Sequence, residues 1–264
     1  MKKILFTLFL ILPINAKALT LPDKIYQGDF VYGKKEKGEQ IFLGDKQLPT
    51  MFDTFVFAVS RDAPETLVLT VKKEGSVKPH PVQILPYNWK IEHINGVPQK
   101  TVEPSPWEQR RIAREQLKIN EARKETTLSG FPMCFLSPLK GRYSGLFGQN
   151  RVYNGIPKNP HSGLDIASPK GTKIKTVADG IVVLSEKDLF YTGGTVIIHH
   201  GSDIYSSYSH LSALNVSVGD SVKQGDIIGL VGATGRATGP HLHLTLMWNN
   251  VRFDPARILK ETCP

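Results

Sequence analysis

The C-terminal half of the chain is divided by glycine-containing turns, and this division constrains its fold more than any other feature. From Cys134 onward, short apolar runs follow one another with no helical period between them. We expect strands at 174–184, 195–200, 204–210, 227–231 and 241–248. The turn signals between them are Asp179-Gly180, Gly193-Gly194, Gly201-Ser202-Asp203, Gly219-Asp220 and Gly225-Asp226. Strands joined by such short turns pair antiparallel, so the sequence predicts an antiparallel all-β domain.

One of these strands carries two histidines on the same face. It reads His241-Leu-His243-Leu-Thr245-Leu246. Side chains alternate faces along a strand, so both histidines and Thr245 share one face while the leucines point into the core. A lone histidine on a strand is more often structural. Two histidines on the same face of one strand are explained equally well by a functional site and by a structural role.

Two further stretches carry residue types that bind metals. Ser206, Tyr208 and His210 are expected on one face of the strand at 204–210, where Tyr208 either hydrogen-bonds a substrate or packs in the core. His161 and Asp165 lie in a segment with proline and glycine, so their spacing is not that of a helical zinc-protease motif. Zinc held by nitrogen and oxygen ligands can generate hydroxide near neutral pH. Together the three stretches predict the zinc site of a hydrolase.

At these residues the sequence resembles the lysostaphin/LytM-type zinc metallopeptidases of peptidase family M23, over about residues 135–255. The shared segments are Phe147-Gly148, Arg151, Asn154-Gly155, the run from His161 to Ala167, Gly171-Thr172, Ala178-Asp179-Gly180, His200-Gly201, Tyr208-Ser209-His210-Leu211, the run from Gly219 to Asp226 and the run from Gly232 to His243. The resemblance implies one Zn²⁺ per chain, bound by His161, Asp165 and His243. It also implies that His210 and His241 are catalytic histidines that do not bind the metal, and leaves open which of them is the base.

The activity that the resemblance implies is hydrolysis of peptide cross-links in peptidoglycan by a metal-activated water, with the peptide stems as partner. An alternative is a non-catalytic LytM-like envelope protein that binds and regulates other wall hydrolases. The complete set of ligand residues favours the enzyme.

The beginning of the chain is typical of a secretory signal peptide. Lys2 and Lys3 precede an apolar run at 4–14, and Ala16-Lys17-Ala18 is a small-x-small cleavage pattern. We therefore expect residues 1–18 to be removed from an exported protein, with the periplasm favoured over an extracellular or wall-associated location. No later stretch is apolar enough to span a bilayer, so no stable membrane insertion is expected.

The net charge fits an envelope protein. Loss of the three lysines of the signal lowers the formal charge from +9 to +6, and a mildly basic protein is attracted to anionic envelope polymers. The positive charge is dispersed and no nucleic-acid-binding motif accompanies it, so nucleic acid is not an expected partner.

Before the peptidase-like region, the sequence predicts a separate small domain. Apolar runs at 55–59, 67–71 and 82–85 read as strands, so residues 19–104 are expected to form an N-terminal β-sandwich-like domain. A peptidase domain is expected at 131–264. A separate domain next to a peptidase unit suggests that the N-terminal part regulates access to the site.

A helix is expected between the two domains, within a linker at 105–130. Ser105, Pro106 and Glu108 combine an N-cap, a proline at the first helical position and a capping box. Charged and other helix-favouring residues continue to about residue 124. The side chains expected to touch a domain are Trp107, Ile112 and Leu117.

The chain has two cysteines, Cys134 and Cys263. In an oxidising compartment they can pair and tie the chain end to the start of the peptidase region. The alternative is two buried free thiols. Neither cysteine has CxxC spacing, so a redox role or cysteine-bound zinc is not expected.

Overall fold

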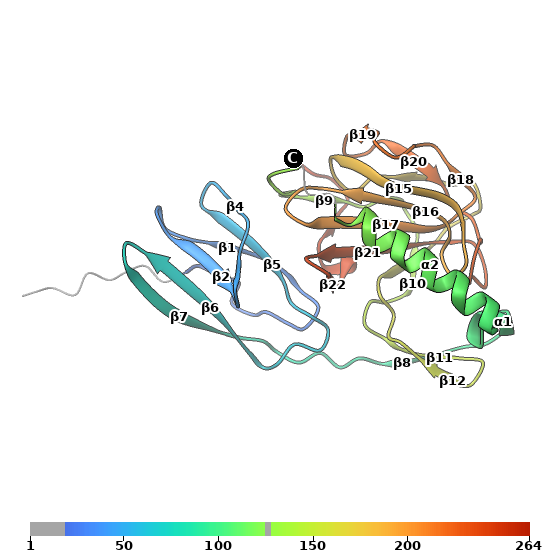
Figure 1. The fold of residues 1–264 in the computed structure, drawn as a ribbon, viewed down its shortest axis with the longest axis horizontal. Helices are drawn as coiled ribbons and strands as arrows, with labels where there is room; N and C mark the ends of the chain where they lie inside the picture. Colours follow the sequence, from blue (N-terminus) through green and yellow to red (C-terminus); the bar gives the residue numbers. More distant parts are fainter. Residues whose placement is uncertain (1–18, 125–127) are drawn as a thin grey trace, which may run out of the picture.

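The computed structural model describes residues 19–124 and 128–264, so the expected signal peptide at 1–18 lies outside the described residues. The described chain forms two lobes connected by a segment of one strand and two helices (Figure 1). Strands dominate both lobes, which confirms the mainly β prediction. No helix in the described ranges is long and apolar enough to cross a membrane.

The N-terminal lobe consists of two small antiparallel sheets, with strand orders β1-β5-β4 and β3-β2-β6-β7. Its strands are β1 (Phe30–Lys34), β2 (Gln40–Leu43), β3 (Lys46–Gln47), β4 (Thr50–Met51), β5 (Thr54–Ala58), β6 (Thr66–Lys73) and β7 (Ser76–Gln83). Every residue of β5 is buried. The expected strands at 55–59 and 67–71 correspond to β5 and β6, while the third expected strand overlaps only the end of β7.

The connecting segment contains β8 (Ile91–Ile94), α1 (Gln99–Val102) and α2 (Pro106–Ala122). The start of α2 is the predicted capping box: the Glu108 backbone N–H donates to Ser105 Oγ, and the Ser105 N–H donates to the Glu108 carboxylate. The sequence therefore located the beginning of this helix correctly.

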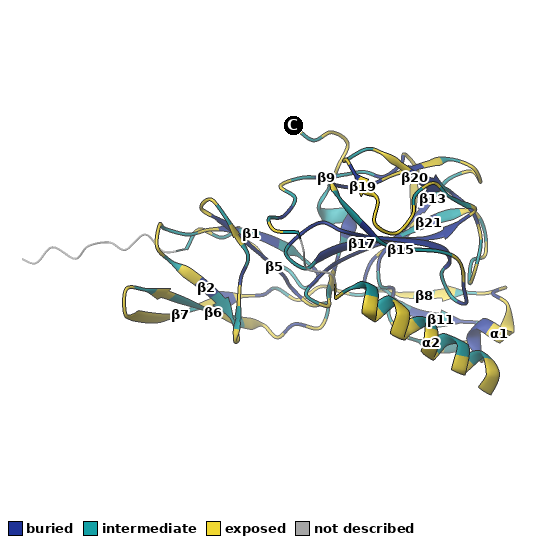
Figure 2. Ribbon diagram, turned by 45° about the horizontal axis from the view of Figure 1, so that its top comes forward, coloured by how far each residue is buried: buried dark blue, intermediate teal, exposed yellow. Residues whose placement is uncertain are grey.

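The inward face of α2 differs from the prediction. Trp107 and Leu117 are 60% and 69% exposed, while the third expected residue, Ile112, is half-buried and lines a cavity of the C-terminal lobe. Ile119 and Ala122 pack against a buried cluster of that lobe. Figure 2 shows the outer side of α2 exposed and the large sheet beside it buried. Apolar residues occur on both sides of this helix, so the sequence did not determine which side meets the sheet.

An eight-stranded antiparallel sheet forms the C-terminal lobe, with the order β10-β13-β21-β17-β16-β15-β19 and β22 paired to β21. Its strands are β10 (Arg142–Gly145), β13 (Leu164–Ala167), β15 (Gly180–Leu189), β16 (Gly193–His199), β17 (Ile204–Leu211), β19 (Ser221–Val222), β21 (His241–Trp248) and β22 (Val251–Phe253). The predicted antiparallel domain is confirmed. Leu242, Leu244 and Leu246 are fully buried on one face of β21, as strand alternation predicted.

Smaller sheets surround this one. The first contains β11 (Asn150–Tyr153) and β12 (Ile156–Lys158) together with β8, and the second contains β14 (Lys173–Lys175), β18 (Ala213–Leu214) and β20 (Ile227–Leu230). The third consists of β9 (Phe135–Leu136) and β23 (Leu259–Lys260), and the 3-10 helix η1 (Pro255–Arg257) precedes β23. The strand expected at 174–184 is thus two strands, because the chain turns before Gly180 and its halves join different sheets. The pairing of β8 with β11 is parallel and joins the connecting segment to the C-terminal lobe.

The two lobes are packed together. One apolar cluster contains buried residues from both, and the rings of Phe30 and Phe253 stack with centroids 4.5 Å apart. Cys134 and Cys263 form a disulfide with Cα atoms 5.8 Å apart, which confirms the predicted pairing and rules out the two free thiols.

Candidate metal centre

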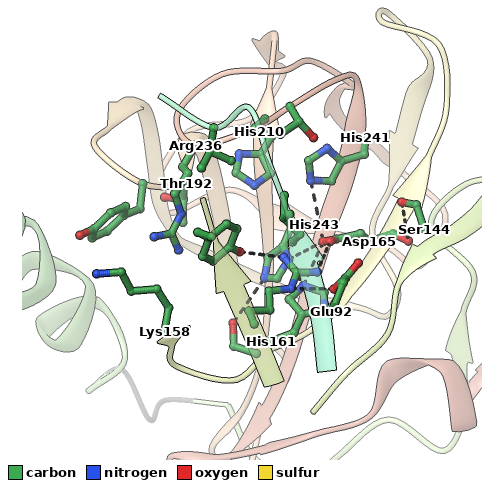
Figure 3. A pocket seen from close by; sticks show the side chains of 18 of the residues that line it. Glu92, Ser144, Lys158, His161, Asp165, Thr192, His210, Arg236, His241 and His243 are labelled. Carbon is green, nitrogen blue, oxygen red and sulfur yellow. Dashed lines mark hydrogen bonds and ion pairs between the residues drawn. The ribbon is translucent and has the colours of Figure 1, made fainter. Parts of the chain in front are cut away.

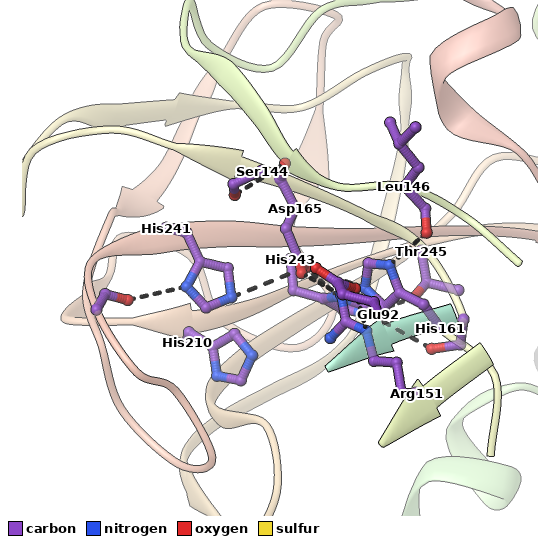
Figure 4. A network of polar contacts seen from close by, with 12 residues as sticks. Glu92, Ser144, Leu146, Arg151, His161, Asp165, His210, His241, His243 and Thr245 are labelled. Carbon is purple, nitrogen blue, oxygen red and sulfur yellow. Dashed lines mark hydrogen bonds and ion pairs between the residues drawn. The ribbon is translucent and has the colours of Figure 1, made fainter. Parts of the chain in front are cut away.

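Three side chains meet at one point on a face of the large sheet. Asp165 on β13 and His243 on β21 are directly paired residues of neighbouring strands, and His161 comes from the loop before β13. His243 Nδ1 lies 2.7 Å from Asp165 Oδ1, and His161 Nε2 lies 2.9 Å from that nitrogen and 3.1 Å from that oxygen. The structure therefore brings together the three residues that the sequence singled out as metal ligands (Figure 4).

Main-chain carbonyls determine which ring nitrogen of each surrounding histidine is protonated. His161 Nδ1 lies 2.8 Å from the Leu146 carbonyl, His210 Nδ1 lies 2.7 Å from the Thr234 carbonyl, and His241 Nδ1 lies 2.9 Å from the Gly239 carbonyl. A carbonyl oxygen only accepts, so each Nδ1 must carry the proton. In the neutral imidazole, Nε2 then carries the lone pair.

His243 is oriented the opposite way. Its Nε2 lies 3.1 Å from Thr245 Oγ1, two residues along the same face of β21. A hydroxyl can accept from Nε2–H, which leaves the lone pair on Nδ1 facing His161 and Asp165. Sequence reasoning found Thr245 on this face but identified no partner that orients the ligand histidines. Thr245 and the Leu146 carbonyl are such partners.

Asp165 is held by a chain of charged groups. Its Oδ2 accepts a 2.8 Å bond from Arg151 Nη2, and Arg151 Nε lies 3.0 Å from the Glu92 carboxylate on β8. This leaves Oδ1 to face the two imidazoles. Burial raises the pKa of the Asp165 carboxyl, but the close side-chain contacts with the His161 and His243 rings outweigh it and bring the pKa well below its ordinary value. The carboxylate is therefore ionised.

The approach of Arg151 to Asp165 requires a glycine on the neighbouring strand. Gly145 of β10 is paired with Asp165. A Cβ at Gly145 would lie 2.4 Å from Arg151 Nη2 and 2.5 Å from Asp165 Oδ2, closer than atoms can pack. The sequence offered Arg151 only as part of a motif. Its partner Glu92 is far away in the chain, and no local signal connected the two.

His210 and His241 lie next to this cluster. Their ring centroids are 4.7 Å apart, and His241 Nε2 is 3.8 Å from Asp165 Oδ1. Burial, and then the neighbouring imidazoles of His241 and His243, lower the pKa of His210 to about 3, so its ring is neutral at pH 7. All four histidines and Asp165 thus line one site (Figure 3).

Tyr208 does not belong to this site. It is directly paired with Leu244, whereas Ser209 is paired with His243, so Tyr208 lies on the core side of the sheet. Its hydroxyl accepts a hydrogen bond from the Val177 backbone N–H, and the ring is fully buried. The expectation that Tyr208 shares a face with His210 was wrong, and the core-packing alternative holds. His210 escapes the alternation because its φ is +66°, a left-handed conformation that interrupts the strand.

A cavity of about 900 Å³ opens beside the five residues. Its walls come from the large sheet, from β11, β12 and the loop before β21, and from the connecting segment through Glu92, Ile94, Val97, Ile112 and Gln116. No residue of β1 to β7 lines it. Outside the C-terminal lobe, the described residues that line the cavity therefore belong to the connecting segment.

The donor set fits a metal ion. Two imidazole nitrogens and one carboxylate oxygen are ligands that Zn²⁺ favours. Three buried acceptor atoms this close together are unfavourable unless a cation or protons lie between them. The three donors also leave space for a further ligand, because the cavity opens beside them.

Comparison with known proteins agrees with this geometry. Residues 159–255 match the model described as peptidase family M23. Over 126 residues the chain is 40% identical to the peptidoglycan DD-endopeptidase ShyA of Vibrio cholerae, which covers 47% of this chain and 28% of the relative. It is 37% identical over 140 residues to an uncharacterised metalloprotease of Buchnera aphidicola, which covers 52% of this chain and 37% of the relative.

A solved structure resembles both lobes. A protein of Pseudomonas aeruginosa named as a peptidase M23 superposes with a TM-score of 0.67 at 27% identity, and the match covers 91% of this chain and 97% of that one. The curated relatives are longer, and the chain spans about a third of their length.

By its fold and its site, the protein is an antiparallel β-sheet protein with the metal-binding side chains of a metallopeptidase. The C-terminal lobe contains a peptidase family M23 domain, matched over residues 159–255. The family that the sequence motifs suggested is confirmed.

Proposed function

We propose that this protein is an exported zinc metalloendopeptidase that hydrolyses peptide cross-links of peptidoglycan. The observation that carries the proposal is the convergence of His161 Nε2, Asp165 Oδ1 and His243 Nδ1 beside two further imidazoles in an open cavity. The name of the Vibrio cholerae relative supports the substrate class. The signal-like start of the chain supports export, with the periplasm as the favoured compartment.

In this proposal His161, Asp165 and His243 hold one Zn²⁺. The ion would polarise the scissile carbonyl and acidify a water molecule. Carbonyls face Nδ1 of His210 and of His241, so the neutral ring of either residue offers its Nε2 lone pair and can accept the proton of the attacking water. Once protonated, the same nitrogen can donate a hydrogen bond to the oxygen on which negative charge develops. The two histidines therefore move the proton and stabilise the charge, and the three ligands keep the metal in place.

The experiment compares wild type with His210→Ala and His241→Ala on isolated peptidoglycan. Wild type should release cleaved cross-linked peptides, lose activity with a chelator and recover it with Zn²⁺. Each variant should lose about 10²- to 10⁴-fold in rate while it still binds zinc one to one, measured by elemental analysis. His80→Ala on β7 is the matched control and should remain fully active. Unchanged rates in both variants would refute these roles. Wild type that binds peptidoglycan without cleaving it would favour the non-catalytic alternative.

We further propose that the connecting segment, rather than the N-terminal sheets, controls access to the site. Residues of β8 and α2 line the cavity, and residues of β1 to β7 do not. The segment is also attached to the C-terminal lobe by the β8–β11 pairing and by a hydrogen bond that the Phe190 backbone N–H donates to the Glu115 carboxylate of α2. Regulation by the N-terminal part would then act through this wall.

A further inference from the structure

The cavity beside the metal centre carries more positive charge than its own carboxylates balance. Five cationic side chains line it: Arg142, Arg151, Lys158, Arg236 and Arg252. The lining acids are Glu92 and Asp165, and both pair with Arg151. Within residues 19–124 and 128–264, the other four cations form no ion pair. The cavity therefore suits an anionic ligand.

Arg236 is the best placed of these cations. Its guanidinium lies between two aromatic rings, with Cζ 4.6 Å from the ring centroid of Tyr153 and 4.5 Å from that of Tyr191. Nη1 donates to the Thr101 carbonyl of α1 at 3.3 Å. These contacts hold the planar group in position without neutralising its charge. A fixed guanidinium with N–H groups to spare can bind a carboxylate through two parallel hydrogen bonds.

Lys158 strengthens this side of the cavity. It stands at the end of β12, and Figure 3 shows its side chain on the same side of the imidazole cluster as Arg236, with Ser144 on the other side. Arg236 precedes the strand of His241 and His243 by only a short loop. A carboxylate bound here would lie within the reach of a short peptide from the histidines.

We propose that Arg236, assisted by Lys158, binds a free carboxylate of an anionic peptide substrate and so selects peptides by charge. The inference rests on the proposed function and narrows it, because it names the charge of the substrate and the residue that recognises that charge. An uncharged cross-link peptide of the same length would bind without the contact to Arg236.

Binding is measured at equilibrium in the presence of a chelator, so that turnover plays no part. The probes are a purified cross-linked stem-peptide dimer with free carboxylates and the same dimer with its carboxylates converted to amides. The proteins are wild type, Arg236→Gln and Lys158→Gln. Arg110→Gln is the control, because Arg110 is exposed on α2 outside the cavity and its loss changes the net charge equally.

Wild type and the Arg110 variant should bind the free acid about ten- to a hundredfold more tightly than the amide, as expected for hydrogen bonds between charged groups. Arg236→Gln should lose most of this preference, and Lys158→Gln a smaller part. Equal binding of acid and amide by wild type, or an undiminished preference in both cavity variants, would overturn the inference. Because no cleavage is measured, failure of the inference and failure of the proposed activity can be told apart. If Arg236→Gln does not fold, the Lys158 variant decides.

Discussion

Replacement of Arg151 by methionine should weaken both metal binding and folding, whereas a matched arginine variant away from the site should weaken folding alone. Arg151 donates to Asp165 Oδ2 and is itself paired with Glu92. Methionine keeps an unbranched side chain as far as the position of Nε and removes the charge and the hydrogen bonds. Asp165 then loses the group that turns its other oxygen, Oδ1, toward His161 and His243.

The expected magnitude follows from the burial of the pair. The side chains of Arg151 and Asp165 are 9% and 10% exposed, so solvent screens them little. Loss of a group that hydrogen-bonds a metal ligand costs about 10- to 100-fold in metal affinity, which is about 1.4–2.7 kcal/mol. Removing one partner of a buried pair also costs about 3–5 kcal/mol of folding stability. Glu92→Gln leaves the bond between Arg151 and Asp165 intact and should weaken metal binding less than tenfold.

The assay is a zinc titration against a competing chelator, combined with thermal melting of the metal-free and zinc-loaded forms. Arg257→Met is the matched control, since Arg257 pairs with Asp29 and Asp254 away from the site. It should lower the melting temperature without changing zinc affinity. Arg151→Met with the zinc affinity of wild type would refute the reasoning, and so would an equal loss of zinc affinity in Arg257→Met.

Two further predictions concern links between distant parts of the chain. Cys263→Ser should lower the melting temperature by about 10 °C, because the disulfide to Cys134 spans 129 residues and closure of such a loop contributes about 4–5 kcal/mol to stability. An unchanged melting temperature in both the variant and the reduced wild type would contradict this. A fragment of residues 131–264 should cleave peptidoglycan about tenfold more slowly than the full chain, because it lacks the whole connecting segment and with it both Glu92 and one wall of the cavity. A fragment of residues 86–264 should recover the rate. Equal rates of the short fragment and the full chain would contradict this.

The sequence predicted the part of the site that depends on regular strand geometry. Alternation along β21 put His241 and His243 on one face and the leucines on the other, and the structure has both. Such a prediction needs only the residues of one strand, because the two-residue period is a property of the extended backbone itself. The turn signals likewise predicted the antiparallel sheet, since short turns permit no other pairing.

The same rule failed on β17, where the backbone is irregular. Two residues separate Tyr208 and His210, so alternation puts them on one face. The left-handed φ of His210 reverses its direction, and the pairing of β17 with β16 shifts register nearby. The Thr192 carbonyl accepts the His210 backbone N–H at 2.7 Å and holds this conformation. A positive φ at a residue other than glycine depends on such tertiary contacts, and the sequence of the strand carries no signal for it.

The groups that orient the proposed ligands were also beyond prediction, for a different reason. The carbonyl of Leu146 orients the proposed ligand His161, and the carbonyls of Thr234 and Gly239 orient His210 and His241; every residue possesses such a carbonyl, so composition cannot distinguish them. Glu92 reaches Arg151 only because β8 pairs in parallel with β11, across a long stretch of chain. Sequence spacing identifies residues that carry unusual chemistry, but not the ordinary groups that a fold brings beside them.

The parallel pairing of β8 and β11 connects these observations. It places Glu92 against Arg151, and the buried cluster of Val97, Val102 and Tyr153 continues the contact into α1. Tyr153 then supports Arg236, whose guanidinium also bonds to the α1 backbone. The connecting segment thus reaches the proposed metal ligands through one arginine and the proposed carboxylate site through another. We therefore propose that residues 91–122 fold and act as part of the peptidase unit, and that a change in this segment alters metal affinity and substrate charge preference together.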